Sequence, residues 1–175
     1  MNIQIDSLAK RFNKEWIFKS ISLNLNSDDR LGIIGSNGSG KSTFIKLISG
    51  AELPSKGEIR YSTDNTEIEV SEIYSKINFA APYIDLIEEF TCKELVDFHL
   101  TFKQFKQELT ADEFIKLVYL KDSEHKFVKN FSSGMKQRLK LGLAICSHSE
   151  LLLLDEPCSN LDSKGIDLYH KLMDD

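Results

Sequence analysis

Eight residues near the start of the chain, Gly35 to Ser42 (GSNGSGKS), restrict its possible folds more than any other segment. They match the pattern G-x-x-x-x-G-K-[ST] in full, and glycines in this pattern let the backbone curl around a phosphate with its N–H groups pointing inward. A short apolar run over residues 31–34 precedes the segment, and apolar residues follow it at helical spacing over 44–48, before Gly50. We therefore predict a buried strand over 31–34, a phosphate-binding loop, and a helix that Gly50 ends.

The candidate phosphate loop offers a nucleotide a charge, a metal ligand and the positive end of a helix. The Lys41 ammonium would meet the β- and γ-phosphates, and the Ser42 hydroxyl would be a ligand of Mg²⁺. A glycine-rich turn that binds nothing is the alternative, but a strand before the motif and a helix after it favour binding. The predicted nucleotide-binding residues of the loop are Gly35, Ser36, Asn37, Gly38, Ser39, Gly40, Lys41, Ser42 and Thr43.

A second motif places two carboxylates at the end of an apolar strand. Four leucines over residues 151–154 are followed by Asp155, Glu156 and Pro157. In a parallel sheet the carboxyl ends of the strands face the ligand crevice, which would present both acids to the phosphates. Asp155 would then hold Mg²⁺, since this ion prefers oxygen ligands, and Glu156 would polarise the attacking water. Taken alone, the motif is also compatible with a strand-terminating turn whose charges are solvated.

The remaining pattern predicts an α/β fold. Alternating apolar residues indicate strands over 3–5, 21–25, 58–62, 66–70 and 76–81, with a turn at Asp64-Asn65. Helices are expected over residues 135–146 and from Ile166 onward. We expect a P-loop NTPase core with a mostly parallel sheet, an antiparallel β arm over about 1–30 and 57–70, and an inserted helical subdomain over about 84–134.

The middle of the chain carries helix-start signals and many phenylalanines. Capping boxes at Thr91–Glu94 and Thr110–Glu113 each precede an apolar stripe. The first stripe is formed by Leu95, Phe98, Phe102 and Phe105, and we expect these side chains in the core.

Composition limits the class of protein. The 175 residues carry a formal net charge of −5, which argues against a nucleic-acid partner, and no apolar run approaches the roughly 18 residues that cross a bilayer. Charges near the N-terminus argue against a signal peptide, and the odd number of cysteines, three, favours reduced thiols. We expect one cytoplasmic domain that reaches a membrane only through a partner.

Two further segments of the sequence resemble the motifs of one protein family. Phe131–Arg138 (FSSGMKQR) resembles the ABC signature LSGGQ-x-Q-R, and Ser159–Asp162 (SNLD), directly after the acidic strand, resembles the family's D-loop. Together with the phosphate loop and the acidic strand, these motifs follow one another along the chain in the order that the family has. The chain therefore resembles the ATP-binding domain of ABC transporters.

The resemblance implies a head-to-tail pair of ATP-binding domains, as a homodimer or heterodimer, with two ATP molecules at the interface. Ser132, Ser133 and Gly134 of one subunit would then act on the ATP held by the other, with Asp162 in the D-loop beside them. The alternative is that Ser132 serves only as the N-cap of the helix that follows it. The family also stacks an aromatic residue on adenine, here Phe12, with Trp16 as a neighbouring candidate and a core aromatic as the alternative.

Three departures from the family pattern affect the expected activity. Pro82 stands where the family carries a glutamine that contacts Mg²⁺. In the signature, Phe131, Ser133 and Met135 replace the leucine, the first glycine and the glutamine of the family pattern. The switch histidine of the family would follow Asp162 on a later strand, whereas His170 falls on a predicted helix and is expected at the surface. We therefore expect a C-terminally incomplete domain that pairs weakly and does not hydrolyse ATP efficiently without the missing part.

The predicted function is ATP binding and hydrolysis, with Mg²⁺, coupled to transport by separate transmembrane permease subunits. This would place the protein in the cytoplasm, peripheral at the inner face of the cell membrane. A soluble ABC ATPase of translation or DNA maintenance is the alternative, as is an ATP-dependent clamp with little hydrolysis. A GTPase is not expected, because the chain has no Asn-Lys-x-Asp motif.

Overall fold

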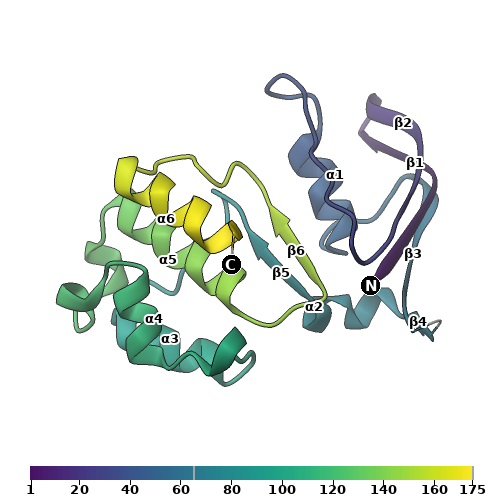
Figure 1. The fold of residues 1–175 in the computed structure, drawn as a ribbon. Coiled ribbons are helices and arrows are strands. Elements are labelled where there is room, and N and C mark those ends of the chain that lie inside the picture. Colours follow the sequence, from purple (N-terminus) through teal and green to yellow (C-terminus); the bar gives the residue numbers. More distant parts are fainter. Residues whose placement is uncertain (65, 175) are drawn as a thin grey trace. The chain divides into compact units, whose positions relative to one another are not determined.

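The computed structural model describes residues 1–64 and 66–174 and divides into two compact units, Met1–Ile77 and Asn78–Asp175 (Figure 1). Each unit is described by itself. Within the described residues, no helix combines the length and the apolar character that a membrane crossing requires.

The first unit is built on an antiparallel sheet. Its strands are β1 (Asn2–Phe12), β2 (Glu15–Leu25), β3 (Lys56–Thr63) and β4 (Thr66–Ile68), in the order β2-β1-β3-β4. Ile3 pairs with Leu25 on one side and with Tyr61 on the other, so β1 is one of the two inner strands of the sheet. The antiparallel strands predicted from the alternating pattern are confirmed. Asp64 adopts the left-handed conformation that a turn after β3 needs, whereas Asn65, the second residue of the predicted turn, lies outside the described residues.

One helix, α1 (Lys41–Ile48), supplies most of the remaining core of this unit. Its apolar side chains over 44–48 are buried, and the buried Tyr61 hydroxyl donates to the Ile48 carbonyl at 2.8 Å. Gly50 follows with a φ of 72°, which confirms it as the residue that ends the helix. A short 3₁₀ turn, Val70–Glu72, and the helix α2 (Ile73–Lys76) complete the unit.

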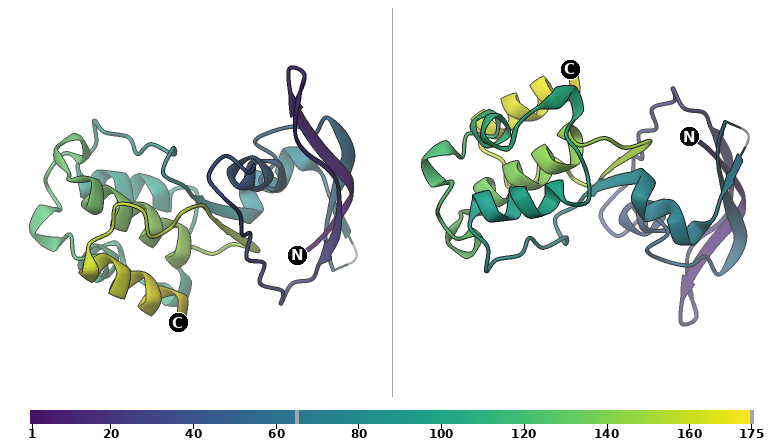
Figure 2. Two further views of the ribbon diagram at one scale, coloured as in Figure 1. Left: turned by 90° about the horizontal axis from the view of Figure 1, so that it is seen from above. Right: turned by 90° about the horizontal axis from the view of Figure 1, so that it is seen from below.

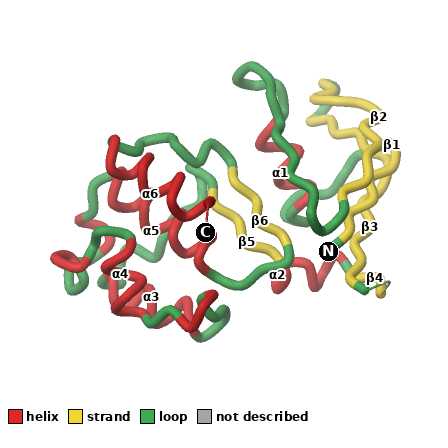
Figure 3. The backbone as a smooth tube through the Cα atoms, in the orientation of Figure 1, coloured by secondary structure: helices red, strands yellow, loops and turns green. Residues whose placement is uncertain are grey.

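The strand predicted over Leu31–Ile34 is not formed, and that prediction is wrong. Residues 31–36 have no regular secondary structure, and Figure 3 draws the segment before α1 as loop. Ile34 is 98% exposed. A strand forms only where a neighbouring strand satisfies its backbone N–H and C=O groups. Neither sheet of the described residues includes this segment, so its apolar pattern alone does not make it a strand.

The second unit contains two strands that run in the same direction, β5 (Ile77–Ala80), which begins at the last residue of the first unit, and β6 (Leu151–Leu154). The helices α5 (Ser133–Cys146) and α6 (Ser163–Asp174) lie side by side in the views of Figure 2. The buried side chains of α5 include Leu139, Leu143 and Cys146, as the helical spacing predicted. His170 is exposed on α6, which confirms its prediction as a surface residue.

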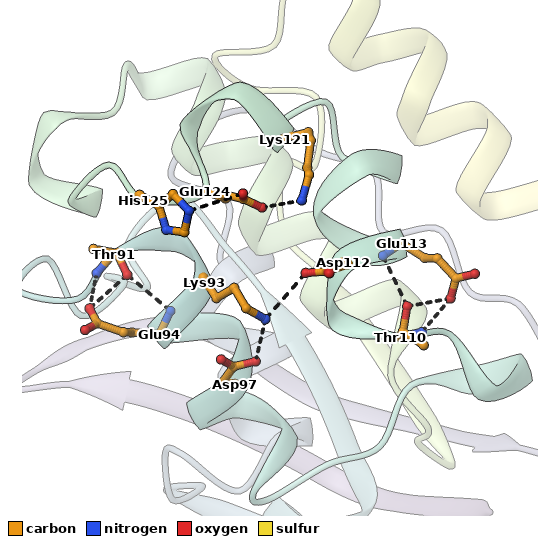
Figure 4. A network of polar contacts seen from close by, with 10 residues as sticks. All are labelled: Thr91, Lys93, Glu94, Asp97, Thr110, Asp112, Glu113, Lys121, Glu124 and His125. Atoms are coloured by element: carbon orange, nitrogen blue, oxygen red, sulfur yellow. Dashed lines mark hydrogen bonds and ion pairs between the residues drawn. The ribbon is translucent and has the colours of Figure 1, made fainter.

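All named elements between β5 and α5 are helical. They are α3 (Cys92–Leu100), α4 (Ala111–Leu117) and the 3₁₀ turns Lys106–Glu108, Lys121–Ser123 and Val128–Asn130. Both predicted capping boxes are present: the Thr91 hydroxyl accepts from the Glu94 N–H, the Thr110 hydroxyl accepts from the Glu113 N–H, and each glutamate bonds back (Figure 4). Lys93 lies 3.4 Å from carboxylates of both Asp97 and Asp112 and so links α3 to α4.

The expected burial of the phenylalanine stripe is wrong for two of its members. α3 ends at Leu100, so its helical spacing does not extend to Phe102 and Phe105. Phe105 is buried and stacks on Phe114 with ring centroids 4.4 Å apart, whereas Phe98 and Phe102 are 42% and 74% exposed.

Candidate functional site: the phosphate loop and the acidic strand end

The predicted phosphate loop follows β2 in the chain and leads directly into α1. Lys41 is the first residue of α1, and its Nζ donates to the carbonyl oxygens of Gly35 and Ser36 at 2.8 and 2.9 Å. The ammonium therefore lies across the loop that precedes it. No acidic side chain stands in the first turn of α1, and no side chain caps its N-terminus. The helix start thus presents free N–H donors beside a cation, which is the chemistry of an anion site.

Glycines are required where the loop meets α1. Gly40 has a φ of 96°, and a Cβ there would lie 2.4 Å from the Ile17 Cγ2. Gly38 has a φ of 80° but faces open space. A side chain at either position would strain the backbone, and one at Gly40 would also collide with β2.

Both adenine-stacking candidates lie near the hairpin between β1 and β2. Phe12 is 46% exposed, and the Lys10 Nζ lies 4.9 Å from its ring centroid. Lys10 is itself buried and bonded to Glu52 at 2.6 Å. Trp16 is less exposed, and cationic groups lie 5.3–5.7 Å from its ring centroid, on Arg11, Lys19 and Lys56. Phe12 therefore has the more open ring of the two.

The acidic strand end is in the second unit, and its first carboxylate is buried. Asp155 directly follows β6, is 4% exposed, and its N–H donates to the Ala80 carbonyl at 2.9 Å, which continues the pairing with β5. Its Oδ2 atom is buried without a hydrogen-bond partner among the described residues. Because a buried carboxylate oxygen without a partner is costly, this atom is suited to a ligand such as a cation.

Tyr83 lies in the loop that follows β5. Its ring packs edge-on against Phe79 with centroids 6.1 Å apart. Burial raises the pKa of the Tyr83 hydroxyl above its ordinary value, and the negative charge of Asp155 raises it further. The phenol therefore stays a neutral hydrogen-bond donor at physiological pH.

Glu156 differs from its neighbour in exposure and in backbone conformation. Its side chain is exposed, and its φ of 45° lies in the left-handed region that residues with side chains rarely adopt. Its carbonyl accepts from the Ser159 N–H at 3.0 Å, which turns the chain away from β6. The sharp turn separates the two acids, so that one is buried and the other is available to solvent.

The signature segment begins α5. The Ser132 hydroxyl accepts from the Met135 N–H at 3.2 Å, so this serine is the N-cap of the helix. Ser132 and Ser133 are exposed, whereas the altered position Phe131 is buried. The N-cap and a contact to an anion do not exclude each other, because the remaining N–H groups of the first turn still lack partners within the helix.

Side chains of α5 hold the D-loop segment in place. The Gln137 Nε2 donates to the Pro157 carbonyl at 3.0 Å, and Arg138 forms an ion pair with Asp162 at 3.7 Å. A Cβ on Gly134 would lie 3.3 Å from the Asn160 carbonyl oxygen, so the signature turn approaches the D-loop backbone closely. Asp162 also accepts from the Gly165 N–H at 2.8 Å, which caps α6. The signature, the acidic strand end and the D-loop are thus one connected region of the second unit.

The loop of residues 81–84 is fixed to α5 by a single lysine. The Lys140 Nζ donates to the carbonyl oxygens of Ala81, Pro82 and Ile84 at 3.1, 3.3 and 3.1 Å. Burial lowers the pKa of Lys140 from its ordinary value. Lys140 was not predicted as a site residue, because no motif marks it and its partners lie more than 50 residues away.

Comparison with known proteins decides the family. The sequence profile of the ABC transporter family matches residues 18–159 of this chain, which is most of its length. The chain belongs to the ABC transporter family.

Two bacterial relatives illustrate the match. The ABC transporter ATP-binding protein YcbN of Bacillus subtilis (strain 168) is 31% identical over 170 residues, which cover 97% of this chain and 55% of YcbN. The bacitracin transport ATP-binding protein BcrA of Bacillus licheniformis is 29% identical over 171 residues, which cover 98% of this chain and 56% of BcrA. This ABC chain thus spans about half the length of the curated relatives that it matches.

A solved structure with the same fold has captured products of ATP hydrolysis. The ATP-binding cassette MJ0796, as a dimer in a post-hydrolysis state with ADP and Pi, is 25% identical and superposes with a TM-score of 0.80 over 98% of this chain and 81% of that one. The expected α/β fold of the ABC ATPases is confirmed.

Proposed function

We propose that this ABC chain binds ATP with Mg²⁺ and that the full-length protein hydrolyses it to drive transport through separate permease subunits. The observation that carries the proposal is the complete GSNGSGKS loop, which leads into an uncapped helix with Lys41 at its first position. The family membership and the names of the relatives support transport as the process that uses the ATP.

Binding would rest on the first unit. Residues 35–43 would surround the phosphates with backbone N–H groups, and the Lys41 ammonium would exchange its contacts with the loop carbonyls for the β- and γ-phosphates. Phe12 would stack on adenine, because its ring is more open than that of Trp16. Fixed by Glu52, Lys10 would support the opposite side of the Phe12 ring.

Two residues would hold the metal ion, Ser42 by its hydroxyl and Asp155 by its carboxylate. The buried Asp155 Oδ2, which has no partner among the described residues, fits this role. Mg²⁺ commonly takes one or two carboxylates, with phosphate oxygens and water completing its six ligands. When bound, it would neutralise charge that develops on the phosphates.

Glu156 would act on water. Its exposed carboxylate would accept a proton from the water that attacks the γ-phosphorus, while the bond to the β–γ bridging oxygen breaks and leaves ADP and phosphate. The turn after β6 supports a division of work, in which buried Asp155 serves the metal and exposed Glu156 serves the water.

We further propose that two ATP-binding domains pair with ATP between them. Ser132, Ser133 and Gly134 of one subunit would contact the γ-phosphate held by the other, and Asp162 would support that surface. The bonds from Gln137 to Pro157 and from Arg138 to Asp162 would make the signature turn and the D-loop move together.

The proposed organisation is one ABC ATP-binding domain over residues 1–175, with the arm at about 1–30 and 57–70, the helical subdomain at about 84–134 and the core in the remainder. Attachment to a permease would place the protein at the inner face of the cell membrane.

Substitution of Glu156 by Gln tests the proposed chemistry. Glutamine keeps the size of the side chain but cannot accept the proton, so Glu156→Gln in the full-length protein should lower ATP turnover by about 10²–10⁴-fold. The affinity for Mg-ATP should stay near that of the wild type, as measured by calorimetry. A Glu156→Gln variant with wild-type turnover would falsify the role of this residue.

A further inference from the structure

The half-buried ring of Trp16 lies among three cationic side chains in the sheet of the first unit. The Arg11 guanidinium carbon is 5.5 Å from the ring centroid, the Lys19 Nζ is 5.3 Å from it and the Lys56 Nζ 5.7 Å. Trp16 and Lys19 belong to β2, Arg11 to β1 and Lys56 to β3, and Arg11 is the register partner of Trp16. Because β1 lies between β2 and β3, strand pairing gathers these charges at one ring.

The three cations are exposed, and none has a carboxylate partner within the part of the chain that the structure describes. Since each charged group lies within 5.7 Å of the same centroid, no two of them are further apart than about twice that distance. Charges in water at physiological ionic strength are screened over roughly 8 Å, a comparable length. The three groups therefore repel one another in part and attract an anion together.

The neighbouring cation Lys10 has different surroundings. It lies 4.9 Å from the Phe12 ring centroid, but it is buried and paired with Glu52 at 2.6 Å. The chain has 27 acidic and 22 basic residues, so carboxylates that could pair with the cations around Trp16 are not scarce. The alternative for the cluster is that the aliphatic stems simply cover the indole ring. That packing requires only the stems, and it does not account for three charges without carboxylate partners at one ring.

The charges around Trp16 favour a phosphate over a flat ring as the ligand. Cations already lie beside the indole, so its π-face is less open than that of Phe12. A phosphate group carries up to about two negative charges and three acceptor oxygens, whereas a carboxylate carries one charge and two oxygens. Guanidinium can bind phosphate through two parallel hydrogen bonds, and lysine binds it as a point charge. Three cations from three strands therefore match a multiply charged phosphate.

We propose that Arg11, Trp16, Lys19 and Lys56 form a second anion site, which takes a multiply charged phosphate group. The group belongs to a free polyphosphate or to the headgroup of an anionic lipid, which share this chemistry. The site has no residue in common with the phosphate loop over 35–43, so it does not depend on the proposed ATP site.

The fluorescence of Trp16 reports on this site directly, because it is the only tryptophan of the chain. Inorganic tripolyphosphate is the probe, and the titration is made in the Lys41→Ala variant, which lacks the ammonium of the phosphate loop. We expect a saturable change in Trp16 emission that weakens as salt is added. A change that occurs in the wild type but is lost in Lys41→Ala would show that Trp16 senses the phosphate loop, and it would overturn the proposal.

Substitutions of the cations test which charges carry the binding. Arg11→Gln, Lys19→Gln and Lys56→Gln should each weaken the binding of tripolyphosphate about two- to fivefold, as for exposed ion pairs, and the triple variant should show no saturable response. Lys14→Gln is the matched control, because Lys14 is an exposed cation in the turn between β1 and β2 and makes no contact with the Trp16 ring among the described residues. An equal response in the triple variant and in Lys14→Gln would contradict the site.

Two further probes identify the source of the phosphate and test its chemical class. Vesicles of phosphatidylglycerol and phosphatidylcholine are compared with vesicles of phosphatidylcholine alone, by co-sedimentation and by Trp16 emission. Binding to the anionic vesicles without a response to tripolyphosphate assigns the site to a lipid headgroup, and the reverse assigns it to a free polyphosphate. A response to neither probe, or a stronger response to citrate than to tripolyphosphate, would overturn the proposal and leave the proposed function standing.

Discussion

The phosphate loop and the acidic strand end are built in opposite ways. The loop is a contiguous run of exposed and half-buried residues whose conformation depends on glycines and on its own backbone. The acidic end depends on side chains from separate segments, since Gln137 and Lys140 both bond to residues far along the chain. A ligand can be expected to reorganise the first site locally, whereas the second is prepared by the packing of its unit.

Asp155→Asn should give the largest effect that distinguishes the two regions. Asparagine keeps the shape of the buried side chain but removes its charge, and the charge stabilisation that a metal ion supplies is worth several kcal/mol. Metal-dependent ATP hydrolysis by the full-length protein should fall by about 10²-fold or more, while ATP affinity in EDTA stays unchanged. If the variant keeps full activity across a magnesium titration, Asp155 is not the metal ligand.

Gly142→Ala tests the packing of the second unit. A Cβ on Gly142 would lie 2.5 Å from Val118 Cγ1 and 2.9 Å from Phe114 Cε2, so the gain in helix propensity should be outweighed by overlap. We expect the free energy of unfolding to fall by about 1–3 kcal/mol in a urea titration. Gly38→Ala in the loop is the comparison, because its φ of 80° is strained but its Cβ meets nothing within 4 Å. A more stable Gly142→Ala protein would contradict the close packing of α5 on α4.

Ser132→Gly separates the two roles of the signature serine and should have the smallest effect on stability. Glycine is a good N-cap, so this change should alter the free energy of unfolding by only a few tenths of a kcal/mol. It removes the hydroxyl that would contact the γ-phosphate of the partner's ATP, and so should weaken Mg-ATP-dependent pairing in sedimentation experiments on the full-length Glu156→Gln protein. Pairing equal to that of the parent would leave Ser132 with a capping role alone.

Contiguous features were the most predictable from the sequence. The phosphate motif, both capping boxes and the alternating strands of the arm depend on neighbours along the chain, and the structure has α1, α3, α4 and the antiparallel strands where the pattern predicted them. The same holds for Gly50, whose φ of 72° follows from its place after an apolar helix.

Features that depend on distant partners were not predictable in the same way. The apolar run at Leu31–Ile34 has the composition of a strand, but composition does not supply the neighbouring strand that pairing needs. Phe98 and Phe102 continue a helical stripe in the sequence, yet α3 ends before Phe102. Lys140 makes contacts that only folding creates, so a single sequence contains no periodic or motif signal for it.

The most direct test of the central claim is a calorimetric titration of this chain with Mg-ATP, compared with Lys41→Ala. Bonds from an ammonium to phosphate oxygens are charge-assisted and worth about 1.5–3 kcal/mol, so the variant should bind Mg-ATP about tenfold or more weakly. Lys116→Ala, which removes an exposed cation from α4, should bind like the wild type. Equal Mg-ATP affinity in the wild type and in Lys41→Ala, or no binding by the wild type, would contradict the claim that residues 35–43 form the nucleotide site.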